Sequence, residues 1–310
     1  MAYNTPPLAN AGGPYAVNEG SSIVLDGAAS SDAEQGPSTL TYTWDLDNDG
    51  TYETAGQSVT FSAAALDGPS SATVGLRVCD NLGVCASGTG AVTVQNVAPA
   101  VTATGGTAVE GGSVTVSGSL TDPGTADAHT FVINWGPGNG TTTLNLAPGA
   151  LTFLATRTFA DDAALSAMVT VTDDDGASGS ANAGVAVSNV APLATLSGAA
   201  TAPVGQPYVV TGTYADAGLA DTHTVTVTWE TGSSETFAVS GGTFTASHQY
   251  ATSGARTITA CVTDDDGGSG CATVSVSVAN AAAKITGGGL RTASNGRGGF
   301  NVQSDGTTIS

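Results

Sequence analysis

Basic residues are scarce in this sequence. Lys and Arg together number 6 among 310 residues, against 26 Asp and Glu, so the formal net charge is −20 at pH 7. A chain with this charge is repelled by nucleic acid and by anionic membrane surfaces, and we expect neither as a partner.

The groups that commonly carry out catalysis are scarce too. The sequence has 3 His, and it contains no Gly-x-Ser-x-Gly elbow, no His-Glu-x-x-His motif and no phosphate-binding loop. General acid–base catalysis therefore lacks its usual groups, and we expect the chain not to be an enzyme.

Long apolar runs and a leader segment are also missing. No run of apolar residues approaches the roughly 20 that a membrane-spanning helix needs. Residues 1–6 have neither a basic region nor an apolar core, so we expect no signal peptide within this sequence and place any secretion signal upstream of it. Gly, Ala, Ser, Thr and Val dominate, which we interpret as an extracellular composition.

A repeated motif organises the chain. The sequence Val-Thr-Asp-Asp-Asp-Gly at residues 171–176 returns at 262–267, and a degenerate copy stands at 78–83. A single Trp precedes each copy, and a junction that contains Asn follows each one. A period of about 92 residues is too long for a solenoid repeat and fits a series of small domains.

The hydrophobic pattern within each repeat has the period of β-strands. Apolar residues alternate with polar ones, as at Leu40, Tyr42 and Trp44, and turn residues recur every 8 to 12 residues or so. This pattern predicts an all-β chain of three tandem immunoglobulin-like antiparallel β-sandwiches, each with its Trp in the core. Strands of about ten residues would give a rod of about 110 Å or more. The expected domains are residues 1–96, 97–189 and 190–280, followed by a Gly-rich basic tail at 281–310.

The four cysteines fit one hairpin register. If Cys79 faces Cys85 across a ladder, aligning the first repeat on the third places Cys261 opposite Cys271, one rung away. Opposed residues in such a ladder are close enough to bridge. We therefore predict two local disulfides and an oxidising compartment. Free thiols and a metal site are the alternatives.

Several motifs resemble those of the PKD domain, an immunoglobulin-like module named after polycystic kidney disease. They are Gly-Gly-Pro-Tyr at residues 12–15, Thr-Trp-Asp-Leu-Asp-Asn-Asp-Gly at 43–50, Asn-Val-Ala-Pro at 96–99 and the Thr-Asp-Asp-Asp-Gly turns. The resemblance covers residues 6–280. It implies modules that act as spacers, adhesion units or accessory domains of bacterial surface and secreted proteins.

Acidic and amide side chains concentrate in loops that a sandwich places where one module meets the next. Packed carboxylates repel one another unless a cation separates them, and Ca²⁺ takes about six to eight oxygen ligands. We therefore predict Ca²⁺ at or beside the junctions. The candidate ligands at the first junction are Glu19, Asp45, Asp47, Asp49, Asn96, Asp122, Asp127, Asp173, Asp174 and Asp175, and those at the second are Glu110, Asn189, Asp216, Asp221, Asp264, Asp265 and Asp266.

A second interpretation of the same residues needs no metal. Asp and Asn tolerate left-handed backbone and Gly completes a tight turn, so these motifs are also ordinary hairpin turns. Residues 45–50 begin like an EF-hand loop, but Gly56 stands where the closing Glu belongs, so we reject that motif. His129, His223 and His248 have no second His or Cys near them in sequence, and we expect structural roles for them.

The function that we expect is structural: an extracellular or cell-surface spacer or adhesion segment of a bacterial surface or filament-forming protein. Its partner would be a protein or a polysaccharide at the cell surface. One alternative is an accessory region of a secreted hydrolase that binds polysaccharide or protein substrate. Another is self-association, in which the tail pairs with a neighbour's sheet edge. The tail contains Lys284, Arg291 and Arg297, and residues 284–289 look like the opening of a further β domain.

Overall fold

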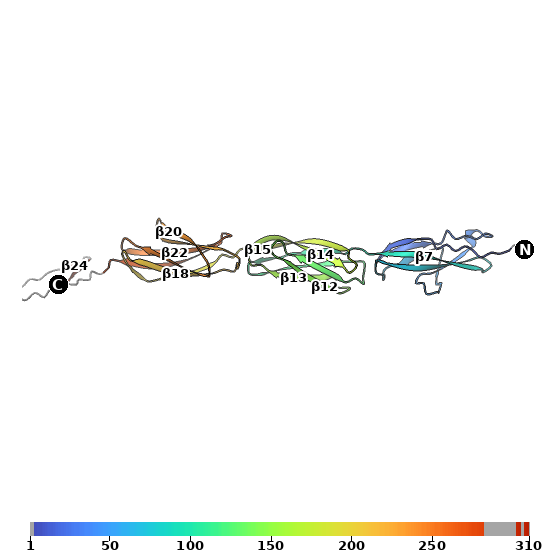
Figure 1. Cartoon of the computed structure of the whole chain (residues 1–310), viewed down its shortest axis with the longest axis horizontal. Helices are drawn as coiled ribbons and strands as arrows, with labels where there is room; N and C mark the ends of the chain where they lie inside the picture. The colour runs from blue at the N-terminus through green and yellow to red at the C-terminus, as the bar shows by residue number, and fades with distance from the viewer. Residues whose placement is uncertain (1–2, 282–301, 305–306, 310) are drawn as a thin grey trace, which may run out of the picture. The chain divides into compact units, whose positions relative to one another are not determined.

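The computed structural model describes residues 3–281, 302–304 and 307–309. Within them the regular structure consists of β-strands and one short 3-10 helix, η1 (Pro37–Thr39). Contacts divide the chain into two units, Met1–Ser188 and Asn189–Ser310. The first unit contains two β-sandwiches and the second contains one, each around a hydrophobic core of its own (Figure 1). The prediction of three tandem sandwiches is confirmed.

Sandwich 1 is built from seven strands in two sheets. A five-stranded sheet in the order β1-β7-β6-β3-β4 faces the pair β2-β5. The strands are β1 (Tyr15–Asn18), β2 (Ser22–Asp26), β3 (Thr41–Asp45), β4 (Thr54–Ala55), β5 (Ser58–Ser62), β6 (Ser70–Cys79) and β7 (Cys85–Gln95).

Sandwich 2 has a second sheet of three strands. Its five-stranded sheet runs β12-β11-β14-β15-β9, and the facing sheet runs β13-β10-β8. The strands are β8 (Ala100–Thr104), β9 (Thr107–Val109), β10 (Ser113–Thr121), β11 (His129–Asn134), β12 (Thr141–Leu146), β13 (Thr152–Thr158), β14 (Ala163–Asp173) and β15 (Ser178–Ser188).

Sandwich 3 repeats this plan with the sheets β17-β23-β22-β19-β20 and β16-β18-β21. Its strands are β16 (Leu193–Gly198), β17 (Thr201–Pro203), β18 (Pro207–Ala215), β19 (His223–Glu230), β20 (Ser233–Val239), β21 (Thr243–Gln249), β22 (Gly254–Asp264) and β23 (Ser269–Ala279). A further antiparallel pair, β24 (Val302–Ser304) and β25 (Thr307–Ile309), follows. The predictions for residues 284–289 and for the tail's basic residues lie outside the described residues.

Alternation along the long hairpin strands builds each core. In β6 the side chains of Val74, Leu76 and Val78 are fully buried, while Thr73 and Arg77 are exposed. One Trp per sandwich lies on, or directly after, the strand beside this hairpin, and Trp44, Trp135 and Trp229 are at most 2% exposed. These residues are core residues, as the alternation predicted.

The sheets depart from the prediction in one respect, because the five-stranded sheet of each sandwich contains one parallel pair. The short strands β1, β9 and β17 run parallel to β7, β15 and β23. Each of these short strands runs in the same direction as the last strand of its module, so pairing the two makes the ladder parallel. In sandwich 2 the chain crosses between sheets at Gly105, where an added Cβ would lie 1.7 Å from the carbonyl oxygen of Gly184.

The disulfides form in the predicted pairing. Cys79 faces Cys85 and Cys261 faces Cys271, with Cα–Cα distances of 4.0 and 4.1 Å. Each disulfide joins the two strands of one hairpin. No helix in the described part of the chain has the length and apolarity needed to cross a membrane.

Candidate metal site

Carboxylates gather at the N-terminal end of sandwich 2, next to the linker from sandwich 1. Asp122, Asp127 and Asp173 each contribute an oxygen, and the three atoms lie within 4.8 Å of one another. The linker residue Asn96 joins them through its amide, which donates from Nδ2 to Oδ2 of Asp173 at 3.2 Å. We call these four residues the linker cage.

The turn between β14 and β15 gives its three aspartates different positions. Asp173 is 5% exposed, and its Oδ1 accepts a hydrogen bond from the backbone N–H of Ala177. Asp174 ties the turn to the loop before β11 by accepting from the backbone N–H of Ala128. Asp175 is exposed. Partial loss of hydration and the negative charges of Asp67 and Asp174 raise its pKa. The turn interpretation is therefore correct for this motif, and Asp173 also faces the cage.

His129 orients the side chain of Asp122 in the cage. Nε2 of His129 lies 2.8 Å from Oδ2 of Asp122, and both side chains are at most 2% exposed. Since an ionised carboxylate only accepts, Nε2 carries the proton and donates it. The structural role expected for His129 is compatible with this contact, because the histidine orients a candidate ligand.

Two polar groups of the cage have no hydrogen-bond partner. Asp127 is 1% exposed, and neither of its carboxylate oxygens accepts a hydrogen bond. Oδ1 of Asn96 is also buried without a donor. Buried polar atoms nearly always have a partner, so an orphaned pair of this kind calls for a proton, a water or an ion. Carboxylate and amide oxygens are ligands that Ca²⁺ prefers, and the donor set fits that ion.

Electrostatics at Asp127 lead to the same conclusion. Burial raises the pKa of Asp127 to about 7; a side-chain hydrogen bond with Asp67, which forms when one of the two carboxyls holds a proton, and the charges of Glu19 and Asp122 add to the rise. A carboxylate in this position is unfavourable when charged and alone. Either a proton or a cation would neutralise it.

Glu19 and Asp67 bring the C-terminal end of sandwich 1 to the same place. Their oxygens and one oxygen of Asp127 lie within 4.8 Å of one another. Glu19 is 1% exposed and accepts two backbone hydrogen bonds, from Val97 N–H at 2.7 Å and from Gly68 N–H at 2.9 Å. We call Glu19, Asp67 and Asp127 the junction trio. The sequence prediction missed Asp67. The one signal that could have identified it is its position shortly before the long hairpin, where sandwich 2 has Asp161.

Sandwich 3 repeats the linker cage within the second unit. Asn189 Nδ2 donates to Oδ1 of Asp264 at 3.1 Å, and His223 Nε2 lies 2.7 Å from Oδ2 of Asp216. Asp264 is 5% exposed, and its Oδ2 and the Oδ1 of Asn189 have no hydrogen-bond partner. Asp221 completes a group with Asp216 and His223.

Sandwich 1 has a partial version of the cage. Asn4 Nδ2 donates to Oδ2 of Asp80 at 2.7 Å, and this bond lowers the pKa of Asp80. Asp32 follows Ser31, which forms an isolated bridge with Leu8, and is the acid that corresponds in sequence order to Asp122. The loop that holds Asp127 in sandwich 2 is replaced here by η1. A cage without that acid has less charge to bind a cation.

The other predicted ligands are placed differently. Asp45, Asp47 and Asp49 form a group of their own in the loop after β3, where Asp45 accepts from the backbone N–H groups of Asp49 and Gly50. Asp265 accepts from Thr222 N–H, which lowers its pKa. Glu110 belongs to the first unit, and Asn189, Asp216, Asp221, Asp264, Asp265 and Asp266 belong to the second. Their meeting at one junction stays a prediction.

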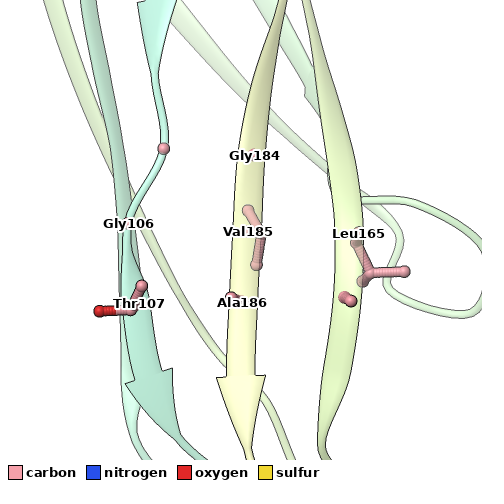
Figure 2. A pocket seen from close by; sticks show the side chains of 8 residues that line it. Gly106, Thr107, Leu165, Gly184, Val185 and Ala186 are labelled. Carbon is pink, nitrogen blue, oxygen red and sulfur yellow. The ribbon is translucent and has the colours of Figure 1, made fainter.

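A depression on sandwich 2 offers little chemistry. It has a volume of about 420 Å³ and lies over β9, β15 and β14 (Figure 2). Gly106, Thr107, Gly184 and Leu165 are among its lining residues, and no lining residue is ionisable. The glycines at the crossing from β8 to β9, together with Gly184, have no side chains to fill this space, which accounts for the depression.

Comparison with known proteins finds distant likenesses. No family model and no curated protein matches the chain. Among solved structures, it is similar to a PKD domain of an M14-like peptidase from a Thermoplasmatales archaeon, at 23% identity over 29% of this chain and 98% of that one, with a TM-score of 0.27.

Two adhesion proteins give longer matches. One is a tetra-tandem repeat in the extending region of a large adhesion protein, at 18% identity over 84% of this chain and 73% of that one, with a TM-score of 0.41. The other is a Ca²⁺-stabilized adhesin of an Antarctic bacterium, at 19% identity over 90% and 75%, with a TM-score of 0.33. Likenesses at these TM-scores carry no argument about function, and the PKD resemblance stays a prediction.

Proposed function

We propose that this chain is a non-catalytic structural and adhesion segment of an extracellular or cell-surface protein. In this proposal it is a rod-like spacer of a bacterial surface or filament-forming protein, and Ca²⁺ bound at the junctions stiffens it. The two disulfides support an oxidising location. The charge of −20 supports a chain that stays soluble and depends on cations where its acids are packed together.

The observation that carries the proposal is the state of Asp127. Its carboxylate is 1% exposed, accepts no hydrogen bond from an N–H or hydroxyl donor when ionised, and has other carboxylates around it. A buried carboxylate without a donor or a cation destabilises the fold, so a turn alone does not account for it. A bound Ca²⁺ would turn the repulsion into attraction and join the loops that carry its ligands.

The substitution Asp127→Asn tests the proposal on the full chain. We expect Ca²⁺ to raise the melting temperature of the wild type, with a gain of about 2.7 kcal/mol when free Ca²⁺ is about 100 times Kd. In Asp127→Asn the gain should be smaller, because the first junction loses a ligand while the cage of sandwich 3 keeps its own. The variant in chelator should be at least as stable as the wild type in chelator. Glu53→Gln, which removes an exposed acid from sandwich 1, is the control and should respond like the wild type.

Two results would reject the calcium part of the proposal. One is a wild type whose melting temperature is the same in Ca²⁺ and in chelator. The other is an Asp127→Asn variant that is destabilised equally in both conditions, which would indicate an ordinary structural role.

A second candidate function is substrate binding in a secreted hydrolase. A groove of about 560 Å³ on sandwich 1 combines apolar Phe61 and Leu66 with polar Asp47, Asn48 and Thr60. Retention of the protein on insoluble chitin, cellulose or collagen would favour this function. Free passage over all three would leave the structural proposal as the better one.

A further inference from the structure

We propose that the junction trio of Glu19, Asp67 and Asp127 is a second divalent-cation site, distinct from the linker cage, whose ion bridges sandwich 1 to sandwich 2. The inference rests on the proposed function, because it assigns a further ion to the same junction. Its chemical class is a hard cation with oxygen ligands, for which Ca²⁺ is the probe.

The trio differs from the linker cage in where its ligands come from. The cage draws all its groups from sandwich 2 and the linker. The trio needs both sandwiches, because Glu19 follows β1 and Asp67 follows β5, whereas Asp127 precedes β11. An ion in the trio therefore holds the two modules together, which an ion in the cage alone does not do.

The distances suit one ion. Oxygens bound to one Ca²⁺ at about 2.4 Å lie no more than about 4.8 Å apart. One oxygen each from Glu19, Asp67 and Asp127 meets that limit, and so does one oxygen each from Asp122, Asp127 and Asp173. Asp127 belongs to both groups. A carboxylate has two oxygens and can bind one ion with each, so Asp127 can bridge a pair of ions.

The surroundings hold Glu19 in place for this role. Its two oxygens each accept one backbone hydrogen bond, from Val97 and from Gly68, and each oxygen keeps a lone pair. Hydrogen bonds of this kind orient a metal-binding carboxylate. The N–H groups of Val97 and Gly68 bind Glu19 and not Asp127. The charge of Asp127 is therefore left without a donor to stabilise it.

Asp67 provides access to solvent. Unlike Glu19 and Asp127 it is exposed, so an ion can reach the trio from outside while its other ligands stay buried.

The C-terminal end of sandwich 3 lacks a residue equivalent to Glu19. The backbone contact that Glu19 makes with Gln95 is made there by Val204 with Ala279, so no carboxylate occupies that place.

The test counts bound ions in the full chain. Ca²⁺ binding to the wild type, Asp67→Asn and Asp122→Asn is measured by titration calorimetry and by native mass spectrometry. Asp67→Asn should bind one ion fewer than the wild type, or bind that ion about tenfold more weakly or worse. Asp122→Asn should lose a different ion and keep the one that depends on Asp67. Glu53→Gln is the control for charge and should match the wild type.

The outcomes separate this inference from the proposed function. If the wild type binds Ca²⁺ and Asp67→Asn binds the same number with the same affinity, the second site is absent and the linker cage stands. If both variants lose the same single ion, one ion serves both groups and the second site is again absent. If the wild type binds no Ca²⁺, the proposed calcium stiffening fails as well. Circular dichroism checks that each variant folds. We expect Asp67→Asn to fold, because Asp67 is exposed.

Discussion

Thr172 and Ser178 face each other across β14 and β15, with their hydroxyl oxygens 2.8 Å apart. The pair closes the ladder next to the turn, six residues apart in sequence. Sandwich 1 has the Cys79–Cys85 disulfide at this rung, also with a separation of 6. Thr172 and Ser178 of sandwich 2 are therefore directly opposed across the hairpin in the same way as the two cysteines of sandwich 1.

We expect the double variant Thr172→Cys, Ser178→Cys to form a disulfide on exposure to air. The crosslink should stabilise sandwich 2 by about 2 kcal/mol, because it closes a short loop in the unfolded chain. Counting free thiols and comparing melting with and without reductant measures both effects. The single variant Thr172→Cys is the control. Two thiols that stay free in the double variant would mean that the two strands are further apart than the structure has them.

The repeat in the sequence was sufficient to predict this hairpin. Taking Cys79 opposite Cys85 and aligning the first repeat on the third placed Cys261 opposite Cys271, and the structure has both pairs, because an antiparallel ladder fixes which residues face each other. The parallel pairing of β1 with β7 was not predicted. A strand of four residues has too little pattern to reveal that it leaves one sheet for the other.

The candidate site was predicted in part. Glu19, Asn96, Asp122, Asp127 and Asp173 come together at the first junction. Topology alone indicated this, because it places loops at the ends of the sandwich. Asp67 was missed, since a lone acid in a long loop has no spacing that marks it as a ligand. Its contribution depends on how that loop folds over Glu19, which needs the three-dimensional structure.

Substitution of Gly20 should disturb the junction. Gly20 has φ of +68°, and an added Cβ would lie 2.6 Å from Cβ of Pro123 in sandwich 2. Gly20→Ala therefore combines backbone strain of about 1 kcal/mol with displacement of the loop that carries Asp127. We expect a lower melting temperature and about tenfold weaker Ca²⁺ binding.

A second glycine separates the two effects of that substitution. Gly140 has φ of +67°, and an added Cβ there would come no closer than 3.8 Å to Arg157. Gly140→Ala should show the strain and keep Ca²⁺ affinity. Equal affinities in the two variants would show that the contact with Pro123 does not position the site.

The side-chain amide of Asn4 acts on the pKa of Asp80. Asn4 bonds Asp80 and is the largest cause of its lowered pKa. In Asn4→Ala we expect the pKa of Asp80 to rise, because the backbone bonds from Leu82 and Val84 remain but the side-chain donor is gone. Titration of the Asp80 carboxyl carbon by NMR measures the change. A pKa that does not move would mean that the amide bond is absent in solution.

Asp127 should give the chain an unusual pH dependence in the absence of divalent cations. Its folded pKa of about 7 lies above the ordinary 3.8, because of its burial and because Asp67, Glu19 and Asp122 face it. Asp173 also borders it, and His129 acts on it only through Asp122, to which its Nε2 is hydrogen-bonded. Between these two pKa values the folded chain binds a proton that the unfolded chain has released. Stability from this group is therefore greatest at low pH and falls as pH rises toward about 7.

Urea unfolding in chelator at about pH 5 and about pH 8 measures that loss. Asp127→Asn removes the titrating group, so the loss between the two pH values should be smaller in the variant, whereas the other carboxylates and His129 contribute to both proteins. Saturating Ca²⁺ should also reduce the loss in the wild type, since the ion stabilises the charged carboxylate and competes with the proton. A wild type and an Asp127→Asn variant with the same pH dependence in chelator would show that Asp127 is ionised throughout, and that the carboxylates at this junction repel each other less than their positions imply.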